Sequence, residues 1–182
     1  MIKNRIGSHI ILRKAKLTDA ESMLKHVWAD KRVYENMLYT PTLTLPDAVE
    51  RCKRSIRFQE EHYAYFIALK DTDEAIGLCA INEYEPHKFE ECGICIGVAH
   101  QGKGYGKEVL SLLLDLTFNE LNGVLFKYGY FIENEKSKNL SKSFGFEYLE
   151  TKEIIRPWDK KEKTIEYCTL SVEKYKNKKV GR

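Results

Sequence analysis

The stretch Gln101-Gly-Lys-Gly-Tyr-Gly106 lies between a predicted strand, 91–98, and a predicted long helix, 105–121. Its three glycines allow a tight turn in which backbone amides point into one concavity. The helix that follows adds free N–H groups and the positive end of its dipole. Together these groups predict a cradle for a pyrophosphate, and Lys103 can add charge attraction from its rim.

Two common nucleotide sites do not fit this glycine pattern. A P-loop requires G-x-x-x-x-G-K-[ST], which the stretch lacks. A dinucleotide-binding fold requires a strand that opens a β-α-β unit and an acidic residue after the second strand. Here the strand before the glycines follows antiparallel hairpins. A nucleotide-binding protein that uses the glycine turn therefore remains only as a weaker alternative.

The hydrophobic spacing on either side of the glycine turn predicts a mixed α/β fold. Thr18-Asp-Ala-Glu21 predicts a capping box for a first helix, and Thr44 with Pro46 predicts the start of a second. The expected order is β-α-α-β-β-β-α-β-α-β-β, with a central, mostly antiparallel twisted sheet and helices on both faces. The expected strands are 9–15, 64–69, 75–85, 91–98, 124–132, 146–156 and 164–172, and the later helices are 105–121 and 134–144.

The composition fits one globular domain, which we expect to span residues 9–173 and to be followed by a frayed basic tail, 174–182. Thirty Lys and Arg against 27 Asp and Glu give a net charge of +3, too small to indicate a nucleic-acid partner. No apolar run approaches the roughly 20 residues of a membrane span. The segment 1–8 lacks the apolar core of a signal peptide. These features predict a cytoplasmic protein that has no membrane partner. We expect the protein to be a monomer or a homodimer.

Five cysteines are an odd number, and most of them lie in apolar runs, which indicates reduced, buried thiols. Cys92 and Cys95 match C-x-x-C. In a strand, however, residues three apart point to opposite faces, so these two sulfurs should diverge. No second cysteine pair is present to complete a zinc site, and the sequence predicts no metal site.

Three motifs of the chain resemble the GNAT superfamily of N-acetyltransferases. The turn Gln101–Gly106 is similar to its Q/R-x-x-G-x-G/A signature for the coenzyme A pyrophosphate. Asn134-Glu-Lys-Ser137, with Phe144-Gly-Phe146, resembles the N-x-x-S…G-F pattern of the RimJ/RimL branch, the ribosomal-protein N-terminal acetyltransferases. Glu91-Cys-Gly93 resembles that branch's E-x-G. The resemblance covers residues 9–173 and implies a GNAT fold that transfers acetyl from acetyl-CoA to a primary amine.

The resemblance also implies where acetyl-CoA would bind. The pantetheine arm would lie in a V-shaped opening between the central strand and the next one, against free backbone groups of Ile96, Gly97 and Val98. Asn134 and Ser137 would lie near the thioester, although both residues are also favoured helix caps. The implied pyrophosphate contacts are Gln101, Gly102, Lys103, Gly104, Tyr105 and Gly106.

Direct attack on the thioester requires a neutral amine, so a base or a water chain must remove a proton. Glu91 on the central strand is the first candidate and Glu153 the second, with Glu83 and Glu85 as further carboxylates. Many family members carry a tyrosine four residues before the G-F glycine as the acid for the thiolate; here that position is Ser141. Ser137, Ser141 or water would then take this role.

Because the chain has Ser141 where many family members have the tyrosine, a second function remains possible: a non-catalytic acyl-CoA sensor. The acceptor is either an amine-bearing small molecule or a peptide or protein N-terminus. Tyr34, Tyr39, Tyr84 and Trp158 are candidates for its side of the site, and with neighbouring carboxylates they would suit a cationic amine.

Overall fold

The computed structural model describes residues 3–180 and contains an eight-stranded sheet in the order β1-β2-β3-β4-β5-β6-β8-β7. The β5–β6 ladder is parallel, whereas β1–β2, β2–β3, β3–β4, β6–β8 and β7–β8 are antiparallel. This agrees with the mixed, mostly antiparallel sheet that the sequence predicts. The strands are β1 Arg5–Ile6, β2 Ile10–Arg13, β3 Ala64–Leu69, β4 Ala75–Glu85, β5 Lys88–Ile96, β6 Leu125–Phe131, β7 Glu147–Ile155 and β8 Glu162–Ser171.

The helices follow the predicted order, with several short additions. The long ones are α3 Leu45–Phe58, α4 Tyr105–Asp115, α5 Glu135–Phe144 and α6 Val172–Val180. The short ones are α1 Ala20–Met23 and α2 Lys31–Tyr34, the 3-10 turns η1 Leu17–Asp19 and η3 Val98–His100, and the π-turns η2 Leu24–Trp28 and η4 Leu116–Glu120. No helix within residues 3–180 combines the length and the apolar character that crossing a membrane requires.

The chain forms two compact units. The first unit consists of the residues up to Ile81 together with Cys92–Leu112, and the second consists of Asn82–Glu91 and the residues from Leu113 onward. The single domain that we expect over residues 9–173 stays a prediction.

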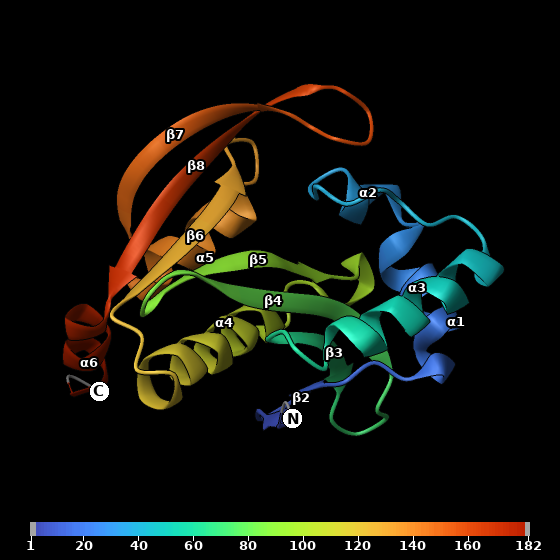
Figure 1. Ribbon diagram of the computed structural model, residues 1–182, viewed down its shortest axis with the longest axis horizontal. Coiled ribbons are helices and arrows are strands. Elements are labelled where there is room, and N and C mark those ends of the chain that lie inside the picture. The colour runs from blue at the N-terminus through green and yellow to red at the C-terminus, as the bar shows by residue number, and fades with distance from the viewer. Residues whose placement is uncertain (1–2, 181–182) are drawn as a thin grey trace. The chain divides into compact units, whose positions relative to one another are not determined.

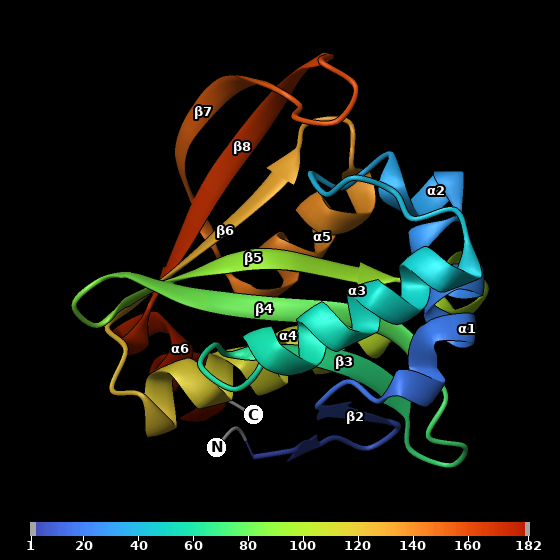
Figure 2. The ribbon, with the colours of Figure 1, turned by 45° about the vertical axis from the view of Figure 1, so that its right-hand side comes forward.

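In the first unit, helix α3 lies on one face of β3 and β4, and the first turns of α4 lie behind them (Figures 1 and 2). Helix α3 begins where the sequence predicts, because the Thr44 hydroxyl accepts a hydrogen bond from the Asp47 N–H at 3.3 Å. It ends at Phe58, four residues before the expected end near His62.

The predicted capping box at Thr18 is wrong. The helical segment begins two residues earlier, at Leu17, and the Asp19 carboxylate accepts from the Lys16 N–H at 2.7 Å. The same carboxylate receives two hydrogen bonds of 2.8 Å from the buried Arg13 guanidinium on β2. A buried charge pair with its hydrogen bonds satisfied holds this start in place, and Thr18 has no part in it.

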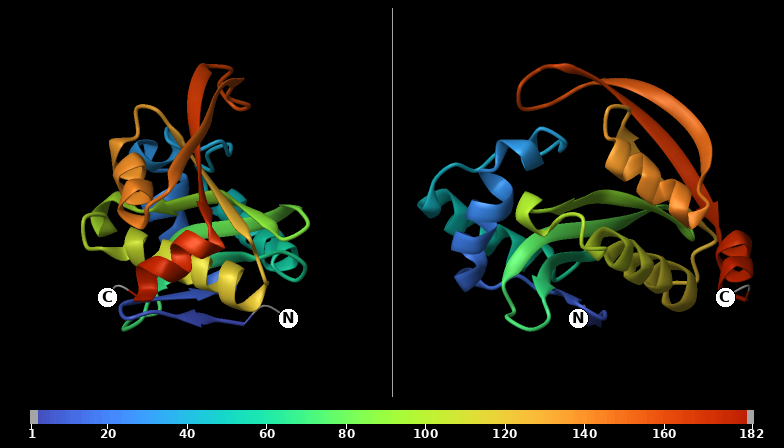
Figure 3. Two further views of the ribbon diagram at one scale, coloured as in Figure 1. Left: turned by 90° about the vertical axis from the view of Figure 1, so that its left-hand side faces the viewer. Right: turned by 180° about the vertical axis from the view of Figure 1, so that it is seen from behind.

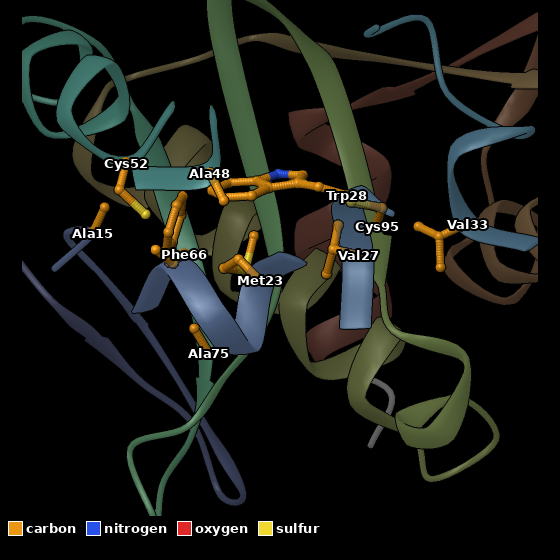
Figure 4. Close-up of a cluster of buried hydrophobic side chains, with 11 residues drawn as sticks. Ala15, Met23, Val27, Trp28, Val33, Ala48, Cys52, Phe66, Ala75 and Cys95 are labelled. Atoms are coloured by element: carbon orange, nitrogen blue, oxygen red, sulfur yellow. The ribbon is translucent and has the colours of Figure 1, made fainter. Parts of the chain in front are cut away.

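Packed side chains from α1, η2, α3, β3 and β5 fill the core of the first unit (Figure 4). The Trp28 indole lies edge-on to the Phe66 ring, with centroids 5.9 Å apart. Met23, Val27, Ala48 and Cys52 are fully buried with them. Burial of this set fixes the two short helical turns after β2 against α3, although neither turn is long enough to be stable alone.

In the second unit, β6 pairs with β8, and β8 pairs with β7 in a long curved hairpin (Figures 1 and 3). Helix α5 ends at Gly145, whose φ of +81° is the left-handed conformation that the sequence predicts for a glycine stop. The parallel ladder joins Lys88–Glu90 to Leu125–Lys127. The V-shaped opening that we expect farther along these strands stays a prediction.

The prediction of a frayed C-terminal tail is wrong for the residues that the structure describes. They form α6, in which Tyr175 is buried against the Phe118 ring at a centroid distance of 4.9 Å. The Tyr175 hydroxyl also donates to Asp115. One aromatic anchor outweighs the polar composition that predicted fraying. The last two residues of the predicted tail, Gly181 and Arg182, lie outside the described residues.

Candidate active site

The glycine turn before α4 has left-handed backbone at two of its glycines and open space in front of both. Gly102 and Gly104 have φ of +78° and +86°, and a methyl group built on either one meets no atom within 4 Å. The Gly104 carbonyl accepts from the N–H groups of Lys107 and Glu108, which starts α4 at Tyr105. In such a start, the amides before Lys107 have no partner within the helix. The turn is therefore open on the side toward which its glycines face.

Gln101 ties the end of β5 to the glycine turn. Its side-chain Nε2 donates to the Ile96 carbonyl at 2.8 Å, and its backbone N–H donates to the Val98 carbonyl at 3.2 Å. The coenzyme A contact that we expect at Gln101 stays a prediction.

The expectation of free backbone groups at Ile96–Val98 is wrong for several of them. Gly97 N–H donates to the Ile76 carbonyl at 2.8 Å, and the Gly97 carbonyl accepts from His100 N–H at 2.8 Å. The Ile96 and Val98 carbonyls are used by Gln101. Part of the cause is the 3-10 turn η3, which the sequence did not predict and which uses the Gly97 and Val98 carbonyls locally, whereas the Gly97 N–H bonds to β4. The pantetheine contact at Ile96–Val98 stays a prediction.

A contact that the sequence did not indicate anchors the start of α4. The Glu108 carboxylate accepts from the N–H groups of His9 at 2.8 Å and Ile10 at 3.2 Å. Burial alone would raise the pKa of Glu108, but these hydrogen bonds outweigh it and the pKa is lowered. A methyl group on Gly7 would lie 1.9 Å from Glu108 Oε1. Because Gly7 has no side chain, the Glu108 carboxylate has room to bind the backbone at the start of β2, and this contact holds the start of α4 against that strand.

Asn134 and Ser137 lie in the second unit, at the start of α5. The Asn134 Oδ1 accepts from the Ser137 N–H at 3.1 Å, so Asn134 caps the helix, as its residue type alone would suggest. The Ser137 hydroxyl lies 2.8 Å from the Tyr128 hydroxyl on β6. Tyr128 was not a predicted site residue. The signal in the sequence was the hydroxyl of Tyr128 on a largely apolar strand, and a tyrosine at such a position can equally well be a core residue.

Glu91 belongs to the same group of side chains. Burial, and after it the negative charge of Glu91, raise the pKa of Tyr128, so this hydroxyl stays protonated. The charge of Glu91 thus acts on the Tyr128 hydroxyl, and that hydroxyl lies beside Ser137. Glu153 is exposed on β7 and lines a separate hollow with Glu133, Glu162 and Lys163.

The other predicted carboxylates have local partners. Glu83 accepts from the His87 N–H at 2.7 Å, and Glu85 pairs with Lys88 at 2.7 Å, both in the β4–β5 turn. The buried Ser141 donates to the Lys138 carbonyl within α5. The Ser141 hydroxyl is therefore engaged by its own helix, and Tyr128 supplies a phenol in the second unit instead.

Three of the predicted acceptor-side aromatics already face cations of the protein. Tyr39 lies 4.3 Å from the Arg51 guanidinium, Tyr84 lies 4.4 Å from the Lys127 ammonium, and Trp158 lies 4.3 Å from the Arg156 guanidinium. A cationic acceptor would compete with these contacts. The aromatic argument for such an acceptor is weaker in the structure than in the sequence.

The first unit also contains a cavity of about 950 Å³ between α3, the loop before it and strands β3 and β4. Its wall includes Tyr39, Arg51, Arg54 and Phe58. The partly buried Arg51 donates to the Thr40 carbonyl and the Thr42 hydroxyl. Asp47 and Glu50 line the cavity too, so it combines apolar surface with charged groups of both signs.

Comparison with known proteins assigns the family. The model of the acetyltransferase (GNAT) domain matches residues 9–147. A curated relative from Bacillus licheniformis, named uncharacterized N-acetyltransferase p20, is 29% identical over 141 residues, which are 76% of this chain and 79% of that protein.

Two solved structures have the same fold. One is from Vibrio cholerae and is provisionally named a ribosomal-protein-serine acetyltransferase; it has a TM-score of 0.77 and 20% identity and covers 93% of this chain and 97% of its own. The other is microcin C7 self immunity acetyltransferase MccE in complex with acetyl-CoA and AMP, with a TM-score of 0.75, 17% identity and coverages of 90% and 93%. Because the family model matches most of its length, the chain belongs to the GNAT acetyltransferases, which use acetyl-CoA as the acetyl donor.

Proposed function

We propose that this protein transfers the acetyl group of acetyl-CoA directly to a primary amine. The observation that carries the proposal is the turn at Gly102 and Gly104, with its positive φ angles and the open space in front of both α-carbons. This shape fits a pyrophosphate held by backbone amides at the start of α4. When bound there, acetyl-CoA supplies the activated thioester, and the protein supplies binding, orientation and proton transfer.

The Tyr128–Ser137 pair is our candidate for the proton donor to the leaving thiolate. Tyr128 carries a proton, and burial and the charge of Glu91 raise its pKa, so Tyr128 becomes a better donor once Glu91 has taken up the proton of the amine. The hydroxyl of Ser137, 2.8 Å away, can pass that proton on. The pair takes the place of the tyrosine that many relatives carry where this chain has Ser141.

Glu91 remains our first candidate for the base that accepts a proton from the amine, directly or through water. It lies near the Tyr128 hydroxyl, so a carboxylate base and a phenolic acid occur in the same group of side chains. Glu153 is the second candidate, and its exposure makes it the weaker one.

For the acceptor, we propose a peptide or protein N-terminus or a small amine, and for the chain a place in the RimJ/RimL branch. The branch proposal rests on Asn134, Ser137 and the Gly145-Phe146 pair, which occupy the start and the end of α5. The fold of the provisionally named ribosomal-protein-serine acetyltransferase supports it.

A screen of amines against purified protein and acetyl-CoA tests the proposal. Release of free thiol that depends on one class of amine is the expected result, and mass spectrometry should find the acetyl group on nitrogen. Isothermal titration with coenzyme A, ATP and NAD provides the second measurement. Binding of ATP or NAD without binding of coenzyme A would overturn the cradle assignment, and coenzyme A binding without thiol release from any amine would favour a sensor.

A further inference from the structure

Three side chains of the first unit meet although they lie far apart in the sequence: His26 in η2, Glu74 just before β4, and His100 at the end of η3. His26 Nε2 lies 2.9 Å from Glu74 Oε1, and the two imidazole rings are 4.9 Å apart in an edge-on arrangement. One donor atom from each of the three lies within 4.8 Å of the others. We propose that they form a binding site for a zinc-type divalent transition metal ion.

The first argument is the state of His100. Both of its ring nitrogens are buried and, among residues 3–180, neither has a hydrogen-bond partner. An unpaired buried polar atom destabilises the folded state, so a native structure usually provides a partner for it. The lone pair of an imidazole nitrogen is a metal ligand, so an ion at this position would give one of these two nitrogens a partner.

The second argument is the chemistry of the three ligands together. Glu74 brings a negative charge, which favours a cation over an anion at this position. Two imidazoles with one carboxylate favour zinc and its neighbours over magnesium or calcium, which prefer oxygen ligands. In the tautomer with its proton on Nδ1, the His26 ring offers its Nε2 lone pair to the ion.

The third argument is that the ligands can close on a metal ion. A tetrahedral ion with bonds of about 2 Å holds its ligands roughly 3.3 Å apart. The ligand atoms now lie within 4.8 Å of one another, so the longest distance between two of them has to decrease by about 1.5 Å when the ion binds. The Glu74 side chain can make this movement because it is 40% exposed. The positive charges of Lys25 and Lys103 act on His100 as well and will weaken binding.

The metal ion would tie together segments that also form the cradle. His100 precedes Gln101, whose side chain braces the end of β5. A methyl group on Gly97 would lie 2.8 Å from the His26 carbonyl, so η2 already touches the end of β5 closely. A metal ion between His26 and His100 would fix η3 against η2. Its expected effect is stabilisation of the first unit, whether or not coenzyme A is bound.

Titration of chelator-treated protein with Zn²⁺, followed by isothermal calorimetry, tests the proposal, and Co²⁺ serves as a coloured probe of imidazole ligation. We expect one equivalent to bind with a rise in the thermal midpoint. His100→Ala and Glu74→Gln should each weaken binding by at least about tenfold. Glu74→Gln keeps the size of the side chain at a half-exposed position, so it should fold even if His100→Ala does not.

The matched controls are His62→Ala and His87→Ala, which remove exposed histidines, and Cys92→Ser, which removes the exposed thiol. These variants should bind zinc as the wild type does. The proposal is overturned if the wild type binds no zinc, if Glu74→Gln binds it with wild-type affinity, or if Cys92→Ser loses it. None of these outcomes depends on acetyl transfer, so failure here leaves the proposed function intact.

Discussion

Replacing Gly104 with valine separates the cradle from an ordinary turn. The residue has φ of +86°, and a methyl group built on it meets nothing within 4 Å, so the added side chain occupies space outside the protein itself. The cost to folding is therefore backbone strain alone, about 1–3 kcal/mol for a non-glycine residue in this region. In a chain of this size, each kcal/mol lowers the thermal midpoint by about 2–4 °C, so the variant should stay folded at room temperature.

The effect on binding should be much larger. Loss of two amide contacts to a charged pyrophosphate, at about 1.5 kcal/mol each, weakens coenzyme A binding by about a hundredfold. Isothermal titration measures this affinity, and circular dichroism confirms the fold. Gly145→Val is the matched control because φ there is +81° at the end of α5: it should lower the thermal midpoint similarly and keep the affinity. Unchanged coenzyme A affinity in a folded Gly104→Val variant would refute the reasoning.

Three further predictions concern catalysis and the anchor of α4. Glu91→Gln should lower turnover at neutral pH more than it raises the KM for acetyl-CoA, and the rate should recover as pH approaches the pKa of the amine; an unchanged pH profile would move the role to another carboxylate or to water. Tyr128→Phe removes the hydroxyl next to Ser137 and should lower kcat by about a hundredfold with little change in KM; equal loss in Tyr130→Phe, whose hydroxyl donates to Glu166 instead, would argue against a specific acid. Gly7→Ala, which brings a carbon to 1.9 Å from Glu108, should lower the thermal midpoint by several degrees, about 1–3 kcal/mol of overpacking; a wild-type midpoint would show that the Glu108 side chain moves aside at no cost.

Local sequence signals predicted most of the regular elements. Thr44 and Pro46 start α3, and Gly145 stops α5, because caps and stops act between residues a few positions apart. The same local logic failed at Thr18. There the buried charge of Arg13 on β2 holds Asp19, and a partner from another element decides where the helix starts.

The backbone conformation of the glycine turn can likewise be predicted from the sequence, since only glycine adopts the φ values of Gly102 and Gly104 without strain. What surrounds the cradle cannot be. The clamp of Glu108 on β2 and the hydrogen bond from the Gly97 N–H to the Ile76 carbonyl join groups far apart in the sequence, whose neighbours cannot be known before the chain has folded. The prediction of free backbone groups failed for this reason.

The sequence by itself therefore determined the order of strands and helices, the open glycine turn and the resemblance to acetyltransferases, all of which depend on short-range spacing. Only the tertiary structure placed the Tyr128 hydroxyl beside Ser137 and within reach of the charge of Glu91. It alone brought His26 and Glu74 to His100. The physical reason is that proton transfer and metal binding act over a few ångströms in space, and the contacts that set those distances join residues separated by many positions in the chain.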